Sequence, residues 1–424
     1  MRRVPMRLCI LTFGSRGDVQ PYVALARALD AAGYPTALLA SPSYRAFIES
    51  HGVEWRSFDT GDPRALIHSP EARELVRGMA NPVRMVRDLI HLIEPLLEKG
   101  YTEACQNTAD ADALLVAPTA LPIAHALRDL RKIPFACAFL QPSHATREFG
   151  SWILPAPPRW LPFRGPLCRW SYRIGWELLY KVTGRAYEHA RQRVLGLPPA
   201  GNPFRAMERE RWPTLYGFSR AVVPRPADWG RELEITGYWF LDREPGWRPP
   251  AALEAFLDAG PKPICVGFGS MPSPDPAALT REVVGALERA GQRGILLSGW
   301  GALAGMSLPE SVFALEAAPH DWLFPRVSAV VHHGGAGTSA AALRAGVPSL
   351  VVPFIADQWF WGERIFRLGA GPRLFSRKRL TADRFAPVLR ELATRESYRE
   401  AAQRIAAEIA SEDGLGRAVA ALPF

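Results

Sequence analysis

The chain has 424 residues, which is enough for two domains that each bury a core. Its 48% hydrophobic and 22% charged residues are ordinary for a soluble globular protein, and no apolar run reaches the ~18 residues that a membrane span needs. The net charge of +9 comes from dispersed arginines without a nucleic-acid-binding motif, so we expect no nucleic-acid partner. Five scattered cysteines without a C-x-x-C pair argue against a zinc site or a disulfide framework and favour reduced thiols in the cytoplasm.

Apolar runs of strand length alternate with helical patterns along the first half of the chain. The run "RLCILTF" at 7–13 predicts a first strand, and a helix is expected at 19–32. Further buried strands are predicted at 36–40, 113–117 and 134–140. Continuous apolar strands separated by helices indicate a parallel sheet that is covered on both faces.

Residues 149–182 interrupt this alternation. Tryptophans lie in or beside proline turns there and are interleaved with arginines, a pattern too irregular for the core of a sheet. Three interpretations remain open: a lid over a pocket, a contact with an anionic membrane, and the ordinary packing of a large loop.

The alternation restarts after a stretch rich in proline and charge at 237–250. The second half predicts strands at 263–268, 294–298, 312–315, 328–332 and 349–354. We therefore expect an α/β fold with two Rossmann-like domains: 1–236, a linker at 237–250, and 251–424, whose last helix packs back on the first domain.

A Phe-Gly-Ser tripeptide ends the first strand of each half, at 13–15 and at 268–270. Ligands of open α/β sheets bind beyond the carboxyl ends of the strands. We expect the two tripeptide loops to face one cleft.

The richest motif is "VVHHGGAGTSAAALRAGVPSLVVPFIADQ" at 330–358. A predicted strand ends at His332-His333, and a glycine-rich loop then opens a helix, an arrangement that places backbone N–H groups and a positive helix end against a phosphate. The alternative is a dinucleotide fingerprint, "GAGTSA" with Asp357 as the ribose-binding acid, in an NAD-dependent oxidoreductase. That fingerprint belongs to the first βαβ unit of its domain, whereas at least three predicted strands precede it here.

Three blocks, at 14–29, 266–271 and 318–371, resemble the family 1 glycosyltransferases of GT-B fold. Within that family, the chain is similar to sterol 3-β-glucosyltransferases and to bacterial antibiotic glycosyltransferases. The resemblance implies two Rossmann-like domains facing across a cleft, with the acceptor on the first and the nucleotide sugar on the second. It implies an inverting hexosyl transfer from UDP-glucose or a TDP-sugar, without a metal or another cofactor.

The resemblance also implies which residues bind the donor. His333, Gly335, Gly337 and Thr338 would hold the diphosphate, Asp357 and Gln358 the sugar hydroxyls. The expected donor-binding residues are Gly14, Ser15, Gly269, Ser270, Ala318, His320, His333, Gly335, Gly337, Thr338, Asp357 and Gln358. The tryptophan platform of plant relatives is missing, because Ala317 occupies its place and Trp322 is expected in the core, so UDP and TDP both stay open.

Asp18 follows the first glycine loop, at the start of the predicted helix. It can cap that helix by accepting a backbone N–H, and the helix end would keep its carboxylate ionised. It can also act as the general base that takes the proton of an acceptor hydroxyl, which is the role that the resemblance implies. The two roles do not exclude each other.

The acceptor side is expected near 140–182, with His144 and Trp152 as its candidate residues. Its aromatic and apolar residues favour a lipophilic alcohol or phenol, such as a sterol, another terpenoid or a polyketide. A cytoplasmic protein in peripheral contact with the inner face of a membrane fits this composition. The competing hypothesis is a catalytically inert auxiliary protein of the same fold, against which the joint retention of Asp18, His333, Asp357 and Gln358 argues.

Overall fold

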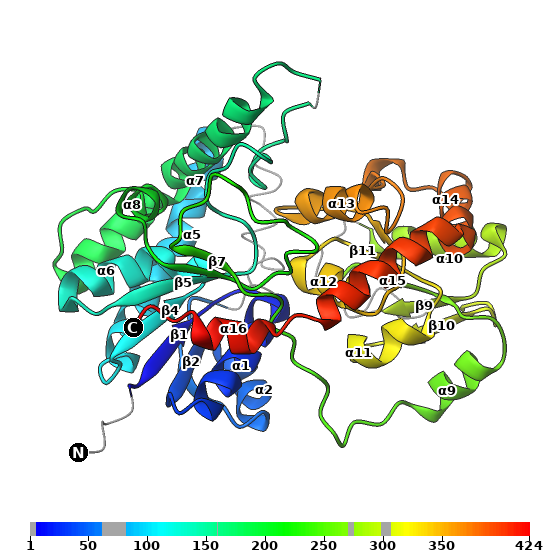
Figure 1. Ribbon diagram of the computed structural model, residues 1–424, viewed down its shortest axis with the longest axis horizontal. Coiled ribbons are helices and arrows are strands. Elements are labelled where there is room, and N and C mark those ends of the chain that lie inside the picture. The colour runs from blue at the N-terminus through cyan, green and yellow to red at the C-terminus, as the bar shows by residue number, and fades with distance from the viewer. Residues whose placement is uncertain (1–5, 62–81, 159, 270–274, 298–306) are drawn as a thin grey trace. The chain divides into compact units, whose positions relative to one another are not determined.

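A computed structural model describes the chain except residues 1–5, 62–81, 159, 270–274 and 298–306 (Figure 1). The chain forms two compact units. The first comprises Met1–Phe218, Arg225–Leu241 and Asp413–Phe424, and the second comprises Ser219–Pro224 and Asp242–Glu412. The stretch predicted as a linker, 237–250, is thus divided after Leu241, and the last residues of the predicted second domain, 413–424, are part of the first unit.

The first unit contains a seven-stranded parallel sheet of order β3-β2-β1-β4-β5-β6-β7. Its strands are β1 (Leu8–Leu11), β2 (Thr36–Ala40), β3 (Glu54–Ser57), β4 (Ala113–Val116), β5 (Phe135–Phe139), β6 (Thr214–Tyr216) and β7 (Leu233–Ile235). Successive strands are added on one side of β1 up to β3 and on its other side from β4 onward. The loops that follow the adjacent parallel strands β1 and β4 therefore meet at this switch point. The Thr119 hydroxyl joins them by donating to the Phe13 carbonyl at 3.0 Å.

Helices accompany this sheet in the order α1 (Arg16–Ala31), α2 (Arg45–Ser50), α5 (Pro82–Asn107), α6 (Leu121–Arg131), α7 (Arg164–Leu195), α8 (Pro203–Glu210) and α16 (Gly414–Ala420). Short 3₁₀ turns are formed by Pro42–Tyr44 and Pro118–Ala120. The chain's last helix, α16, lies beside α1 (Figure 1) and buries Ala418 in the first unit's core. A methyl group at Gly414 would lie 2.3 Å from the Tyr238 carbonyl oxygen, so this close approach requires glycine.

The segment 149–182 differs from its sequence-based description, because most of it is helical. Helix α7 starts at Arg164 and runs to Leu195, so the described irregular residues are 149–158 and 160–163. Pro166 is tolerated because it stands in the first turn, where its missing N–H has no helical partner. Cys168, Tyr172 and Trp176 are buried at helical spacing. The aromatic residues are therefore divided between a buried and an exposed face.

The second unit contains a five-stranded parallel sheet of order β10-β9-β8-β11-β12. Its strands are β8 (Ile264–Gly267), β9 (Gly294–Leu297), β10 (Val312–Leu315), β11 (Ala329–His332) and β12 (Ser349–Val351). Its helices are α9 (Ala251–Asp258), α10 (Pro276–Ala290), α11 (His320–Leu323), α12 (Ala336–Arg344), α13 (Gln358–Arg367), α14 (Ala382–Thr394) and α15 (Glu396–Ala410), with 3₁₀ turns at Phe324–Arg326 and Arg377–Arg379. The order reverses between β8 and β11, so Gly269 and His333 follow adjacent strands at the switch point of the sheet.

Every strand predicted from an apolar run is present in these two sheets. In the described part of the chain, no helix has both the length and the apolar character that crossing a membrane requires.

Candidate active site

The loop after β1 holds the Asp18 side chain in place. Ser15 is the N-cap of α1, and Asp18 stands at the third helical position. Asp18 Oδ2 accepts hydrogen bonds from the Ser15 backbone N–H at 2.8 Å and from the Ser15 hydroxyl at 2.9 Å. Gly14 has a φ of 142°, and a methyl group there would lie 2.4 Å from Asp18 Oδ2. The glycine is therefore required by the backbone conformation and by the carboxylate beside it.

Burial raises the pKa of the Asp18 carboxyl above its ordinary value, and the two hydrogen bonds from Ser15 oppose this shift. Loss of hydration therefore outweighs the two hydrogen bonds in setting the direction of the shift, which the sequence alone did not reveal. A raised pKa makes the carboxylate a stronger base. Its second oxygen, Oδ1, has no hydrogen bond to the described residues, which leaves it able to accept a proton.

The glycine-rich loop of the second unit joins β11 to α12. The helix begins at Ala336, with Gly335 as its N-cap. Gly334 has a φ of 95°, and a methyl group there would lie 2.6 Å from Val351 Cγ1, so the turn requires glycine. A methyl group at Gly337 would meet nothing within 4 Å. The first turn of α12 thus borders open space, as an anion-binding helix end requires.

The His333 ring lies between Gly269 and Gly335. A methyl group at Gly335 would be 2.5 Å from His333 Nε2, and one at Gly269 would be 3.1 Å from His333 Cε1. Burial lowers the pKa of His333 to about 4, so the ring is neutral at physiological pH. Its Nδ1 is buried without a hydrogen-bond partner in the described part of the structure. A neutral imidazole retains one N–H that can be donated to a phosphate oxygen.

The neighbouring His332 has a different environment. It is fully buried, and its Nδ1 accepts the Gly334 backbone N–H at 3.1 Å. Burial holds its pKa well below the ordinary value. His332 therefore fixes the turn, and only His333 of the pair lies in the loop between the glycines.

Asp357 and Gln358 follow β12, the neighbour of β11 in the sheet. Gln358 Oε1 accepts the backbone N–H groups of Phe354 at 2.6 Å and Ile355 at 3.0 Å. Asp357 Oδ2 accepts the Trp361 indole N–H at 2.7 Å. These side chains hold the loop between β12 and α13 in shape, and sugar binding by them stays a prediction.

The segment expected to contact the base, Ala318 to His320, leads into α11. The His320 ring stacks on Phe324 with 4.3 Å between centroids. Trp322 is buried, 5.3 Å from the Trp247 ring, which confirms its predicted place in the core. Thr338 lies in the first turn of α12, as expected, whereas Ser270 lies outside the described residues.

Two family models match the chain. Residues 8–149 match the glycosyltransferase family 28 N-terminal domain, and residues 301–419 match the C-terminal domain of erythromycin biosynthesis protein CIII-like proteins. The sterol 3-beta-glucosyltransferase of Cryptococcus neoformans is 35% identical over 99% of this chain, and that of Arabidopsis thaliana is 33% identical over 98%. Over nearly its whole length the chain is thus similar to glycosyltransferases, and its fold is GT-B.

Solved structures agree on the fold. The glycosyltransferase of kitacinnamycin superposes with a TM-score of 0.70 at 20% identity, covering 98% of both chains. The calicheamicin glycosyltransferase CalG4 superposes with a TM-score of 0.68 at 18% identity, covering 99% of this chain and 97% of that one. The chain spans 27% of the Cryptococcus protein and 65% of the Arabidopsis protein.

The predicted acceptor residues, His144 and Trp152, lie in the first unit, after β5. The His144 ring contacts the Tyr216 hydroxyl through Nδ1 at 2.6 Å, and burial lowers the pKa of His144 to about 3. The Trp152 ring lies 5.7 Å from that of Trp176. The low pKa makes His144 a weak base.

Four buried polar atoms near this part of the GT-B chain have no hydrogen-bond partner among the described residues. They are His144 Nε2, Trp152 Nε1, Tyr172 OH and Trp229 Nε1. Buried polar atoms are normally satisfied, so water or a ligand hydroxyl is the expected partner. The sequence did not reveal Tyr172, Tyr216 or Trp229, because these residues come from separate segments and follow no common motif.

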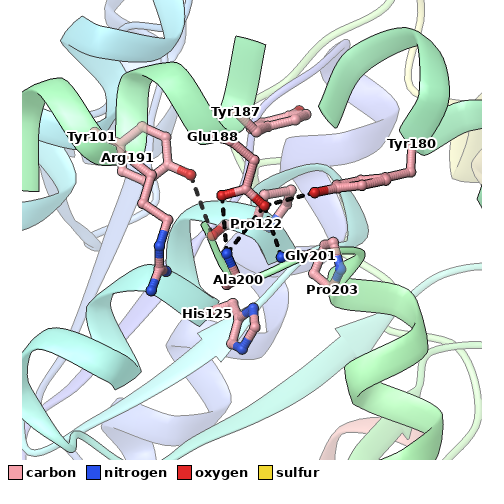
Figure 2. Close-up of a pocket in the computed structure, with 10 residues that line it drawn as sticks. All are labelled: Tyr101, Pro122, His125, Tyr180, Tyr187, Glu188, Arg191, Ala200, Gly201 and Pro203. Carbon is pink, nitrogen blue, oxygen red and sulfur yellow. Dashed lines mark hydrogen bonds between the residues drawn. The ribbon is translucent and has the colours of Figure 1, made fainter. Parts of the chain in front are cut away.

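A pocket in the first unit is lined by residues of α5, α6 and α7 and by the segment that leads into α8 (Figure 2). Glu188 occupies it and accepts the Tyr180 hydroxyl at 2.6 Å and the Gly201 N–H at 2.8 Å. Arg191 donates to Asp129 at 2.7 Å and to the Pro198 carbonyl at 2.7 Å. Since Glu188 and Arg191 each have hydrogen-bond partners of their own, and neither His144 nor Trp152 lines the pocket, we assign it a structural role.

Proposed function

We propose that this chain transfers a hexose, glucose in the simplest case, from UDP-glucose or a TDP-sugar to the hydroxyl of a lipophilic alcohol or phenol. The observation that carries the proposal is the neutral His333 ring between two glycines at the N-terminus of α12. The names of the curated relatives, sterol 3-beta-glucosyltransferases, support glucose as the sugar and a sterol-like alcohol as the acceptor.

The proposed reaction is a single displacement at the anomeric carbon. The acceptor oxygen forms a bond to that carbon while the bond to the diphosphate breaks, and Asp18 takes the hydroxyl proton. The leaving diphosphate gains negative charge, which the N–H groups of the α12 N-terminus and the N–H of His333 stabilise. Attack from the side opposite the leaving group inverts the centre, so an α-linked donor gives a β-glucoside.

The acceptor is proposed to bind beside His144 and Trp152. The unsatisfied polar atoms on Tyr172 and Trp229 supply hydrogen-bonding groups within an otherwise aromatic surrounding. This combination suits an apolar molecule with one or a few hydroxyl groups. We include peripheral contact with the inner face of a membrane in the proposal, because such acceptors partition into lipid; the five free thiols support the cytoplasm as the compartment.

The donor half is tested by calorimetry with UDP, UDP-glucose and TDP in the presence of EDTA. We expect UDP or TDP and the matching sugar nucleotide to bind without a divalent metal, and His333→Ala to weaken binding at least tenfold. The matched control is His51→Ala, which removes a histidine from the first unit. Absence of binding by every nucleotide would overturn the proposed donor.

The transfer half is tested with a panel of sterols and phenols, the products being read by mass spectrometry. A glycosylated product, or slow hydrolysis of UDP-glucose without an acceptor, excludes the inert auxiliary protein. The oxidoreductase alternative predicts quenching of protein fluorescence by NADH. One observation argues against an oxidoreductase. A dinucleotide fingerprint follows the first strand of its domain, whereas "GAGTSA" follows β11, the fourth strand of the second unit in chain order.

A further inference from the structure

A row of apolar side chains is exposed along the N-terminal half of α7 and the turn before it. Trp160 is 80% exposed, Phe163 81% and Trp170 62%. Leu167, Ile174 and Leu178 continue the row and are also exposed. Large apolar residues exposed singly are ordinary, whereas a contiguous row of them marks an interaction surface.

The spacing of these residues places them on one side of the helix. From Phe163 to Leu178 they cover an arc of about 80° at 100° per residue. The side that faces the first unit's core carries Cys168, Tyr172 and Trp176 instead, all of them buried. The exposed row is therefore a second apolar face that the described residues leave uncovered.

Basic residues flank this apolar row. Residues 160–185 contain five basic side chains and a single acidic one, Glu177, which is bound to Arg205 at 2.6 Å. Arg164 donates to backbone carbonyls of Pro157 and Glu148. Arg169 and Arg173 are exposed beside the row and have no ion pair or hydrogen bond to the described residues.

Lys181 and Arg185 lie further along α7. They are likewise exposed and unpaired within the described part of the chain. By contrast, Arg191 and Arg193 near the end of the helix are paired with Asp129 and Glu98. The uncompensated positive charge is thus concentrated beside the exposed apolar row.

We propose that this face of α7 docks on an anionic membrane surface, with Trp160, Phe163 and Trp170 inserted at the interface. Exposed tryptophans flanked by basic residues are the composition of helices that lie in the plane of a bilayer interface. Unpaired arginines complement the anionic headgroups. A second copy of the chain fits less well, because a two-fold contact between these faces would bring the unpaired arginines of both copies together.

Docking would hold the protein where a lipophilic acceptor is concentrated, and this advantage for transfer rests on the proposed function. Binding to vesicles can be measured without transfer, because it requires no catalysis. Failure of vesicle binding and failure of transfer are therefore separate results.

The experiment is co-sedimentation of the full chain with vesicles of phosphatidylcholine alone and of phosphatidylcholine containing phosphatidylglycerol. We expect binding to the anionic vesicles that weakens at least tenfold between 50 mM and 500 mM salt, and little binding to the neutral ones. Binding that is equal for both compositions, or absent from both, overturns the proposal. Sedimentation velocity without lipid tests the alternative occupant: a dimer abolished by Trp170→Ser would assign the face to a second copy.

Two variants locate the surface. Phe163→Ser with Trp170→Ser, and Arg169→Gln with Arg173→Gln, should each reduce anionic-vesicle binding at least tenfold while leaving the melting temperature unchanged. The matched controls are Leu130→Ser, which removes an exposed leucine from α6, and Arg384→Gln with Arg404→Gln, which removes two exposed arginines from the second unit. Equal losses in the controls and the α7 variants would overturn the assignment to this helix.

Discussion

The carboxylate of Asp18 is bound to Ser15 through one oxygen only. Oδ2 accepts both the backbone N–H of Ser15 at 2.8 Å and its hydroxyl at 2.9 Å. Oδ1 makes no hydrogen bond to any described residue. Capping and proton acceptance can therefore be performed by different oxygens of one side chain, which makes the two roles of Asp18 separable by substitution.

Asp18→Asn should fold normally and transfer sugar poorly. The amide oxygen can still accept from Ser15, so the melting temperature should change little. The amide cannot take a proton, so kcat should fall by roughly 100-fold or more, the scale of general-base catalysis. Single-turnover rates beside calorimetric UDP binding measure this, and UDP binding should be unchanged.

The control for Asp18→Asn is Asp18→Ala, which removes the acceptor of both Ser15 donors. It should lower stability by on the order of 1 kcal/mol in addition to removing activity. If Asp18→Asn turned over normally while Asp18→Ala were merely less stable, Asp18 would be a cap and the base would be elsewhere.

Gly14→Ala should impair catalysis far more than a matched glycine substitution. The new methyl group would lie 2.4 Å from Asp18 Oδ2, so the carboxylate must move. Gly33→Ala is the control, because Gly33 also has a positive φ, 90°, and its methyl group would meet nothing within 4 Å. Both variants have an unfavourable backbone conformation, and only Gly14→Ala displaces the carboxylate. Equal kcat values for the two would contradict the positioning of Asp18 by Gly14.

The buried strands were predictable because parallel sheets covered on both faces produce continuous apolar runs. The run at 36–40 coincides with β2, and the run at 312–315 coincides with β10. Strands β3, β6 and β7 were not predicted. They are short, and β3, Glu54–Ser57, is a polar edge strand whose Arg56 binds Asp110. Such strands contain no apolar run from which they could be predicted.

Helix α7 was not recognised because prolines and glycines precede and interrupt its first turns, and because its exposed face is apolar. A helix with apolar residues on both faces lacks the usual amphipathic period. The raised pKa of Asp18 was also beyond the sequence, since burial is a tertiary property. The glycine-rich loop, in contrast, is predictable because its function depends on the backbone.

Acidification should destabilise the fold through His144. Burial lowers the pKa of His144 from 6.5 to about 3, so the unfolded chain binds the proton first as the pH falls. The contribution of neutral His144 to the free energy of unfolding is therefore fully present above pH 6.5. It is lost as the pH falls toward the pKa of His144 in the folded state, by about 1.4 kcal/mol per pH unit for one histidine. Urea unfolding at pH 7.0, 6.0 and 5.0 measures the slope.

The variant that isolates this contribution is His144→Asn, which cannot titrate. It should be less stable than the parent at pH 7, because the contact with Tyr216 is altered, but its stability should depend less on pH. Parallel pH profiles for parent and variant would show that His144 is not buried as a neutral ring.

Gly337→Ala should make the chain more stable and bind its donor less well. Gly337 is a helical residue of α12, and alanine there favours the helix by up to about 1 kcal/mol over glycine. No described atom lies within 4 Å of the added methyl group, so the protein itself offers no clash. The diphosphate proposed to bind at this helix end would meet the methyl group, and UDP affinity should fall at least tenfold while the melting temperature rises.

Gly335→Ala is the control for Gly337→Ala. Its methyl group would lie 2.5 Å from His333 Nε2 and must displace that ring, so UDP affinity should fall without a gain in stability. A Gly337→Ala variant that is more stable and binds UDP as tightly as the parent would show that the phosphate lies elsewhere.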